Sequence, residues 1–338
     1  MTDLLKRGKG QFFTRGNPFV YPLYQQWFEN EVVPNIKNMT FLEPFAGSNS
    51  IVKLIEEVYP NHGSDWSCYD IDPESNEKNL TDIPIHIQDV LLDFPKGFDI
   101  AITNPPYLAK NSASRRGIHF PHEQYDDLYK YCLHVMLENT PYVAAIIPES
   151  FIVQNLFHSR LYGVISLKSK MFDDTECPVC LALFVPESAK QNPDDFIIYS
   201  NEDYIGHYQS LKQYIEKPTG AGIKMSFNDP DGEISVTTID GTKGDSIVFM
   251  SGEAIDGAKI KVSSRSFTKI SGFSGFTSEQ IFSIIEESNK LLAQRREKTH
   301  DVFMTAFKGL RKDGKYRRRL DFAQVRDIIN SAIIKLFP

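Results

Sequence analysis

Short apolar runs alternate with helix-like segments through the first half of this chain, and this alternation limits the folds open to it. The run YVAAII at residues 142–147 is apolar or aromatic throughout, which is typical of a strand covered on both faces. Strands and helices in such alternation predict an α/β fold, with a doubly wound, mostly parallel sheet. We expect strands at 39–44, 66–71, 83–87, 98–103, 142–147, 163–167 and 179–185, and helices at 50–59 and 122–138.

The local composition of the sequence changes near Pro186, where a polar stretch with two prolines follows the last apolar run. A length of 338 residues corresponds to about two domains. Beyond this stretch lie short β-like pieces (ISVTTI, SIVFM and KIKVSS) and then two amphipathic helices, expected at 278–298 and 321–336. Thr277 and Gln280 have the spacing of a capping box at the first of these helices. We therefore expect two domains, 1–186 and 187–338, the second of α+β type.

The strongest chemical signal is Asn104-Pro105-Pro106-Tyr107, placed directly after the apolar run FDIAIT. Two prolines stop a strand from continuing its ladder, and ligands of α/β sheets bind at the carboxyl edge. Asn104 Oδ1 and the Pro105 carbonyl could each accept an N–H, while the Tyr107 ring could stack on a planar molecule with an exocyclic amino group. We expect Tyr107→Phe to be tolerated and Tyr107→Ala not, because the ring is what is required. The alternative is a strand terminator with a packed tyrosine.

Acidic residues follow three successive strands of the predicted sheet. Glu43 precedes a turn that contains Gly47, Asp70 ends the second strand, and Asp89 follows the third. A carboxylate in the first position could hold an amino group, one in the second a ribose diol, and one in the third an adenine amino group. Each has an ordinary alternative, a βα turn or a helix cap, but three at successive strand ends favour a nucleoside site.

These motifs, in this order, resemble the amino-group DNA methyltransferases, specifically the gamma-class adenine-N6 enzymes of type II restriction–modification systems. The resemblance covers roughly residues 7–186. KGQFFT, FLEPFAGSN, YDIDP, IQDVL, NPPY and IIPESF resemble successive family motifs, and Phe172 resembles a second aromatic near the target base. Asn49 stands where the family usually has a second glycine. The resemblance implies a Rossmann-like catalytic domain at 1–186 and a target-recognition domain at 187–338.

The resemblance also implies S-adenosylmethionine as the cofactor, no metal, and double-stranded DNA as the substrate, with a cognate restriction endonuclease as a possible partner. Glu43 would face the methionine amino group, Asp70 the ribose, and Asp89 the adenine amino group. The implied catalytic residues are Asn104, Pro105, Pro106, Tyr107 and Phe172. The implied cofactor residues are Gln11, Phe12, Phe13, Thr14, Glu43, Pro44, Phe45, Ala46, Gly47, Asp70, Ile71, Asp89, Val90 and Asn104.

Charge is distributed unevenly along the chain. Residues 290–338 hold 13 Lys and Arg against 5 Asp and Glu, a net +8, so the rest of the chain carries −15 of the total of −7. A basic end on an acidic body indicates an anionic partner, nucleic acid first, although a solvated helix pair is an equal alternative on charge alone. The expected DNA-binding residues are Lys110, Arg115, Arg116, Arg265, Lys308, Arg311, Lys312, Lys315, Arg317, Arg318 and Arg319.

Several other functions remain open or are disfavoured. An RNA or protein-glutamine methyltransferase, a DNA cytosine-N4 methyltransferase, and a catalytically silent nucleic-acid-binding protein are the alternatives. No apolar run approaches the roughly 18 residues of a membrane span, and the N-terminus lacks a secretory pattern. We therefore expect a cytoplasmic protein, with a monomer favoured.

The Cys177-Pro-Val-Cys180 spacing is interpreted as buried thiols, because no second ligand pair accompanies it.

Overall fold

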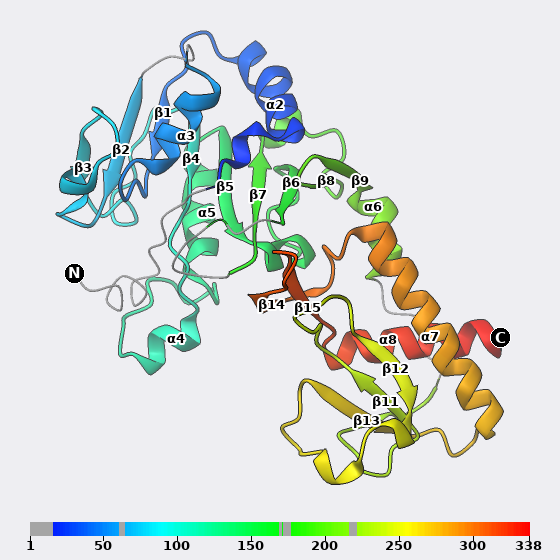
Figure 1. Cartoon of the computed structure of the whole chain (residues 1–338). Helices are drawn as coiled ribbons and strands as arrows, with labels where there is room; N and C mark the ends of the chain where they lie inside the picture. Colours follow the sequence, from blue (N-terminus) through cyan, green and yellow to red (C-terminus); the bar gives the residue numbers. More distant parts are fainter. Residues whose placement is uncertain (1–15, 61–64, 169–170, 172–176, 216–221) are drawn as a thin grey trace. The chain divides into compact units, whose positions relative to one another are not determined.

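The computed structural model describes residues 16–60, 65–168, 171, 177–215 and 222–338 (Figure 1). The chain divides into two compact units, Met1–Tyr208 and Gln209–Pro338. These are called unit 1 and unit 2 below. Among the described residues no helix has both the length and the apolar character that crossing a bilayer requires.

Within the described part of unit 1, nine strands form one mixed sheet in the order β3-β2-β1-β4-β5-β7-β6-β8-β9. The first five in this order are parallel, β7 runs antiparallel to both its neighbours, and β9 runs antiparallel to β8. The bounds are β1 Phe41–Glu43, β2 Trp66–Asp70, β3 Ile85–Ile87, β4 Ile100–Thr103, β5 Tyr142–Pro148, β6 Leu161–Leu167, β7 Val179–Phe184, β8 Ile197–Ser200 and β9 Asp203–His207.

This architecture confirms the predicted α/β fold class, and all seven expected strands are present. The compact unit extends past residue 186, where the domain boundary was expected, because β8 pairs with β6 and β9 pairs with β8. The helix expected from residue 122 begins only at α5 (Leu128–Asn139), since the preceding Asp127 has an extended backbone and forms a bridge with Ala109. The shorter helices are α2 (Pro22–Trp27), α3 (Ser50–Val58) and α4 (Lys110–Arg115).

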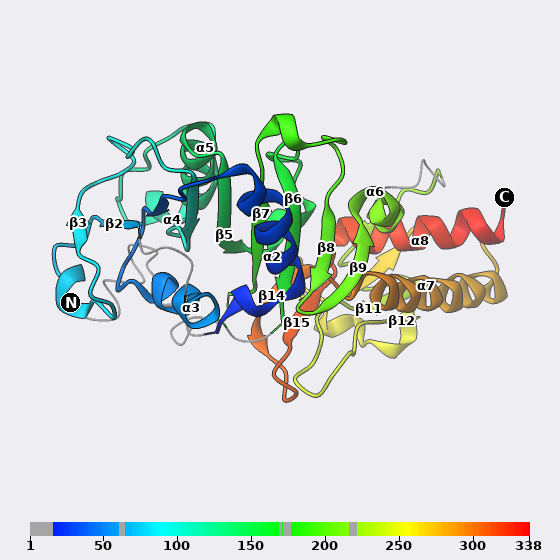
Figure 2. The same ribbon diagram turned by 90° about the horizontal axis from the view of Figure 1, so that it is seen from above.

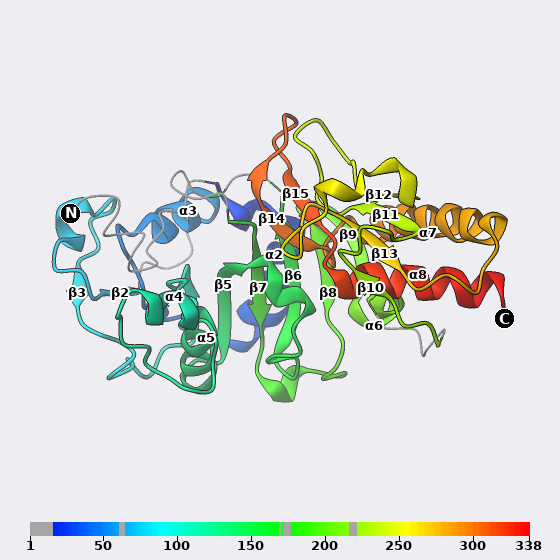
Figure 3. The same ribbon diagram turned by 90° about the horizontal axis from the view of Figure 1, so that it is seen from below.

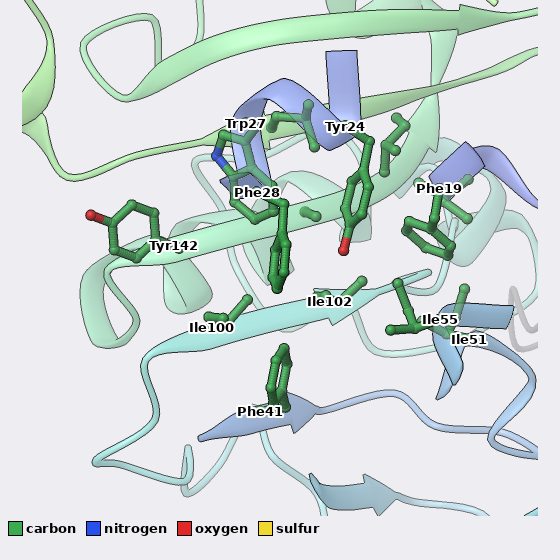
Figure 4. Packing of buried hydrophobic residues seen from close by; sticks show 14 of the residues in the cluster. Phe19, Tyr24, Trp27, Phe28, Phe41, Ile51, Ile55, Ile100, Ile102 and Tyr142 are labelled. Atoms are coloured by element: carbon green, nitrogen blue, oxygen red, sulfur yellow. The ribbon is translucent and has the colours of Figure 1, made fainter. Parts of the chain in front are cut away.

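An aromatic cluster covers one face of this sheet (Figure 4). Tyr24 and Trp27 of α2 are fully buried with Phe28, in the same cluster as Ile100 and Ile102 of β4. The Trp27 indole N–H donates to the Phe184 carbonyl at 3.1 Å, so this buried ring keeps a hydrogen-bond partner. Ile100 and Ile102 of β4 therefore pack into the core on this face, and Asn104 follows the strand at its carboxyl end.

Unit 2 is an α+β structure, as expected for the C-terminal region. A four-stranded antiparallel sheet has the order β10-β13-β11-β12, and the helices α7 and α8 lie beside one another (Figures 2 and 3). The KIKVSS segment, expected to be β-like, forms turns instead, and β13 begins after it and lies between β10 and β11. The bounds are α6 Tyr208–Leu211, β10 Ser226–Phe227, β11 Ile234–Thr237, β12 Val248–Ser251, β13 Phe267–Ser271, α7 Ser278–Thr299, β14 Thr305–Leu310, β15 Tyr316–Arg319 and α8 Phe322–Leu336.

Both long helices of unit 2 begin with a capping box. The Thr277 and Gln280 box predicted for α7 is confirmed, and a second box joins Asp321 and Gln324 at α8. Between the helices, β14 and β15 pair as an antiparallel hairpin with an irregularity between Phe307 and Leu310. The basic segment of the sequence is therefore a hairpin, a shape that its run of charges concealed.

Candidate active site at the carboxyl edge of the sheet

The strand order reverses beside β1, because β1 pairs with both β2 and β4. These strands are parallel, so their last residues all lie at the carboxyl edge of the sheet. These residues are Glu43 of β1, Asp70 of β2 and Thr103 of β4. The crevice at such a reversal is where open α/β sheets bind ligands. The predicted convergence of Glu43, Asp70 and the NPPY motif at this edge therefore agrees with the strand topology.

Glu43 is a fully buried carboxyl group at the end of β1. Its Oε1 accepts the Phe45 N–H at 3.0 Å and the Thr103 hydroxyl. Its Oε2 is buried and has no hydrogen-bond partner in the described part of the chain. Burial raises the pKa of Glu43 to about 8, against the lowering effect of the bonds from Thr103 and Phe45. A buried polar atom without a partner is costly, so this oxygen suits a ligand that brings a positive N–H group, whose charge would favour the ionised form of Glu43.

The turn after Glu43 is tied to β2 through Asp70. Gly47 has a φ of 54°, a left-handed conformation that favours glycine, and its N–H donates to Asp70 Oδ2 at 2.7 Å. Asp70 Oδ1 accepts the Asp72 N–H, also at 2.7 Å. Asp70 thus shapes the turn as well as standing at the expected ribose position. A carboxylate offers about four acceptor sites, so these two bonds are compatible with further acceptance.

Asn49 shows how this chain dispenses with the second glycine of the turn. Its φ of 58° is left-handed, a conformation that asparagine tolerates better than most residues. The fully buried side chain donates from Nδ2 toward Asn79 Oδ1 and Thr81 Oγ1, both at 3.1 Å, and the Ile83 carbonyl at 3.0 Å. Asn49 was not among the predicted site residues, and its place in the glycine position is the signal that could have found it.

The expected adenine pocket has one exposed apolar side chain beside Asp70. Ile71 is 58% exposed directly after β2, whereas Val90 is buried. The Gln88 N–H donates to the Asp70 carbonyl at 2.9 Å, which brings the neighbouring Asp89 close to β2. Asp89 Oδ1 accepts the Leu91 N–H at 3.0 Å. Asp89 therefore caps this turn, which is the ordinary alternative given for it. Its place close to the end of β2 is also compatible with the nucleoside interpretation.

The NPPY motif leaves β4 with its tyrosine turned toward the core. The Tyr107 hydroxyl lies 2.6 Å from Asn104 Oδ1 and 2.6 Å from the Ile146 carbonyl. Burial raises the pKa of Tyr107 well above its usual value, so the hydroxyl keeps its one proton, which these two acceptors share. The half-buried ring meets the Tyr129 ring edge-on, with 6.2 Å between centroids. Since the hydroxyl holds Asn104, phenylalanine is not an equivalent replacement for Tyr107, and that sequence-based expectation is revised.

The buried backbone at Pro105 offers a further acceptor. No described residue donates a hydrogen bond to the Pro105 carbonyl. The geometry therefore places an amide oxygen and a backbone carbonyl at consecutive residues just past the strand end. This pair could accept both protons of an amino group, as the motif suggested. Pro106 is half-buried.

A buried ion pair that the sequence did not reveal lies along the same edge. Glu149 follows β5, and its Oε1 accepts the hydroxyl of Ser166 on β6. Lys168 Nζ lies 3.6 Å from that oxygen. Because β5 and β6 run in the same direction, this pair shares the carboxyl edge with Asn104. Neither residue belongs to the predicted set, although Glu149 stands within the IIPESF motif.

Some of the remaining predicted residues lie outside the described part of the chain, and the others are hydrogen-bonded or exposed within it. Gln11, Phe12, Phe13, Thr14 and Phe172 lie outside the described residues, as does the side chain of Lys308. Lys110 Nζ donates to the Glu123 carbonyl at 3.1 Å, and Arg115 Nε to the Asn111 carbonyl at 3.2 Å. Arg116 and Arg265 are exposed. No cluster of three or more potential metal ligands occurs among the described residues. Cys180 is buried on β7 as expected, whereas Cys177, expected to be buried as well, is only partly buried.

No known protein-family model matches the chain, and no curated protein sequence matches it. Among solved structures, it is similar to a proposed class I S-adenosylmethionine-dependent methyltransferase from Listeria monocytogenes (14% identity, 53% of this chain and 64% of that chain, TM-score 0.40). It is also similar to the methyltransferase subunit of a type I restriction-modification system from Streptococcus thermophilus (18%, 56% and 47%, 0.42). A proposed RNA methyltransferase from Pyrococcus horikoshii follows (16%, 54% and 90%, 0.38).

These similarities are distant. This chain spans 64% of the Listeria structure and 47% of the Streptococcus structure. At such identities and scores the likeness assigns neither a substrate nor a partner.

Proposed function

We propose that this chain is an S-adenosylmethionine-dependent methyltransferase that modifies the N6 amino group of a flipped adenine in duplex DNA. The observation that carries the proposal is the pair of acceptors at the end of β4, Asn104 Oδ1 and the Pro105 carbonyl, beside the buried Glu43 of β1. The expected biological role is protection of DNA from a cognate restriction endonuclease.

The residues at the edge fit the cofactor. Glu43 Oε2, buried and unpartnered among the described residues, matches an ammonium group. Asp70 can accept ribose hydroxyls with its remaining lone pairs, and the exposed Ile71 offers an apolar surface to an adenine ring. When bound, S-adenosylmethionine supplies a sulfonium methyl group that is already activated for transfer.

Asn104 and Pro105 address the main chemical difficulty, which is that the exocyclic nitrogen of adenine is a poor nucleophile. Its lone pair is delocalised into the ring. Acceptors on both amino protons draw electron density to that nitrogen, and the same oxygens stabilise the positive charge that develops on it. An amide oxygen can accept two hydrogen bonds, so Asn104 Oδ1 can serve the base while the Tyr107 hydroxyl holds it in place.

Tyr107 has a second role in the proposal. Extruding a base from the duplex costs a few kcal/mol, and stacking on an aromatic ring contributes roughly 1–3 kcal/mol per base. Tyr107 is half-buried and anchored by its hydroxyl, so its ring is held in one orientation at the strand end. A fixed ring and a fixed amide favour alignment of the amino group for direct transfer, which needs orientation more than a strong base.

The test is transfer of a tritiated methyl group from S-adenosylmethionine to duplex DNA, RNA of the same sequence, and a glutamine-containing peptide. We expect label in DNA alone, recovered as N6-methyladenine after digestion to nucleosides. Label recovered as N4-methylcytosine, in RNA or in the peptide identifies the corresponding alternative enzyme. Absence of cofactor binding by calorimetry would contradict methyltransferase activity altogether.

A further inference from the structure

Two loops of unit 2 are joined into one projection. Residues 241–246 follow β11, and residues 311–315 form the turn between β14 and β15; these are called the paired loops. The Lys312 N–H donates to the Thr242 carbonyl at 2.7 Å, and Arg311 Nη1 donates to Asp245. The hairpin and β11 can be followed in Figures 2 and 3. Within the turn, the Arg311 N–H donates to the Lys315 carbonyl at 2.8 Å, and Gly314 has a left-handed φ of 79°.

The arginines around the paired loops are engaged inside unit 2. Arg311 also bonds Asp313 through Nε at 3.2 Å and Nη2 at 2.7 Å. Arg317 Nε donates to the Asp240 carbonyl at 2.6 Å, with its guanidinium 5.1 Å from the centre of the Phe307 ring. Arg318 is buried. These three residues were expected to bind DNA. In the structure the guanidinium groups of Arg311 and Arg317 bond within unit 2, and Arg318 is buried.

Arg296 of α7 also bonds to residues in and beside the paired loops. It holds the fully buried Asp240 by two parallel bonds, Nη1 to Oδ1 at 3.1 Å and Nη2 to Oδ2 at 2.9 Å. Its Nη2 also lies 2.9 Å from Asp245 and 2.8 Å from Asp301. A planar guanidinium suits such multiple carboxylate contacts. The carboxylates of Asp240 and Asp245 are thereby neutralised within the unit.

The lysines of the paired loops differ from the arginines. Lys243, Lys312 and Lys315 are exposed. Their ammonium groups form no ion pair or hydrogen bond with any residue that the structure describes. Asp245 and Asp313 are already paired with Arg311. The projection therefore presents three unpaired cations on a backbone that its own ion pairs hold in shape.

We propose that the paired loops bind the phosphate backbone of duplex DNA through Lys243, Lys312 and Lys315, while the arginines hold the loops in position. This inference rests on the proposed function for the identity of the polyanion. A lysine ammonium acts as a mobile point charge that suits phosphate oxygens. Contacts of this kind fix the position of a protein on the duplex without reading its sequence.

The test compares two triple variants of the full chain. One replaces Lys243, Lys312 and Lys315 by alanine. The matched control replaces Lys224, Lys259 and Lys290, which are also exposed in unit 2 and also unpaired within the described residues, so both variants lose the same charge. Affinity for a duplex is measured by fluorescence anisotropy at several salt concentrations, and calorimetric unfolding checks that both variants fold.

We expect the paired-loop variant to lose at least tenfold in affinity at low salt. Its slope of log affinity against log salt should fall by about 2 to 3, because each phosphate contact contributes about 0.9. The control should stay near the wild-type slope. Equal losses in the two variants, or no loss in the first, would overturn the proposal, as would a larger effect on RNA than on duplex DNA.

The outcomes separate this inference from the proposed function. Methylation of duplex DNA by the wild type, with unchanged binding by the paired-loop variant, removes the loop proposal alone. A paired-loop effect on duplex binding without any methyl transfer removes the enzymatic proposal alone.

Discussion

The hydroxyl of Thr103 donates a hydrogen bond to Oε1 of Glu43, so the last residue of β4 is bonded to the last residue of β1. The two strands are neighbours in the sheet. Asn104 is the next residue after Thr103, and Glu43 leads into the Gly47 turn. The proposed cofactor pocket and the proposed base pocket are therefore linked by one buried side-chain contact.

Removing this contact should affect cofactor binding without touching the NPPY motif. In Thr103→Val, Glu43 Oε1 keeps only the Phe45 N–H, and the pKa of Glu43 rises further because the Thr103 bond lowers it. We expect roughly tenfold weaker S-adenosylmethionine binding by calorimetry at neutral pH, and about 1–3 kcal/mol lower stability. Thr103→Ser keeps the hydroxyl and should behave almost as the wild type. Equal binding by the valine and serine variants would remove the role of the hydroxyl.

Glu43 should make the stability of unit 1 depend on pH. Burial raises its pKa from 4.5 to about 8, so between these values the folded chain holds a proton that the unfolded chain has released. Stability then falls as pH rises through this window, by at most about 5 kcal/mol. Glu43→Gln cannot titrate and should lose this component.

Urea unfolding followed by tryptophan fluorescence measures this effect. Both tryptophans of the chain, Trp27 and Trp66, lie in unit 1, so the signal reports that unit. The advantage of Glu43→Gln over the wild type should grow between pH 5.5 and 8.5. The same variant should bind S-adenosylmethionine poorly, because an amide does not pair with an ammonium. A stability difference that stays constant with pH is the contrary result.

Asn104 and Tyr107 should separate chemistry from cofactor binding. Asn104→Ala is expected to abolish methyl transfer while calorimetric binding of S-adenosylmethionine survives. Tyr107→Phe keeps the ring but loses the bonds to Asn104 and Ile146, so we expect a five- to tenfold lower kcat, corresponding to about 1 kcal/mol. Tyr107→Ala should lose far more, because stacking is lost too. Full turnover by Tyr107→Phe would show that the hydroxyl does not position Asn104.

Asn49 allows backbone strain and side-chain bonding to be separated. Asn49→Ala must keep a left-handed backbone and loses its side-chain bonds, so we expect a loss of about 2–3 kcal/mol. Asn49→Gly keeps the backbone conformation at little cost and should lose only about 1–2 kcal/mol. Tryptophan fluorescence during urea unfolding again provides the measurement. A glycine variant less stable than the alanine variant contradicts the conformational explanation.

Replacing Arg296 should lower the stability of unit 2. Arg296→Met leaves the buried Asp240 without its main partner, and removal of one member of a buried ion pair costs about 3–5 kcal/mol. Calorimetry should show a lower unfolding transition for unit 2, with the tryptophan signal of unit 1 unchanged. Lys335→Ala breaks the exposed pair with Glu287 and serves as the control, with an expected cost below about 1 kcal/mol.

The sheet of unit 1 could be predicted because its strands are apolar and bounded by turn residues, a local signal. The α7 capping box could be predicted because Thr277 and Gln280 are three residues apart. The β14–β15 hairpin was missed because five of the eight residues from Arg311 to Arg318 are basic, which hides any alternation. The boundary at residue 186 missed β8 and β9, since polar residues and prolines before a strand look the same as a linker.

The sequence by itself determined which residues end the strands and therefore which functional groups share the carboxyl edge. The tertiary structure alone decided how those groups are bonded. Thr103 reaches Glu43 across 60 residues, and Arg311 reaches Asp245 across 66. Pairs this distant leave no periodic trace in a single chain. The difference between a bracing arginine and an exposed lysine therefore appears only when the partners are brought together by folding.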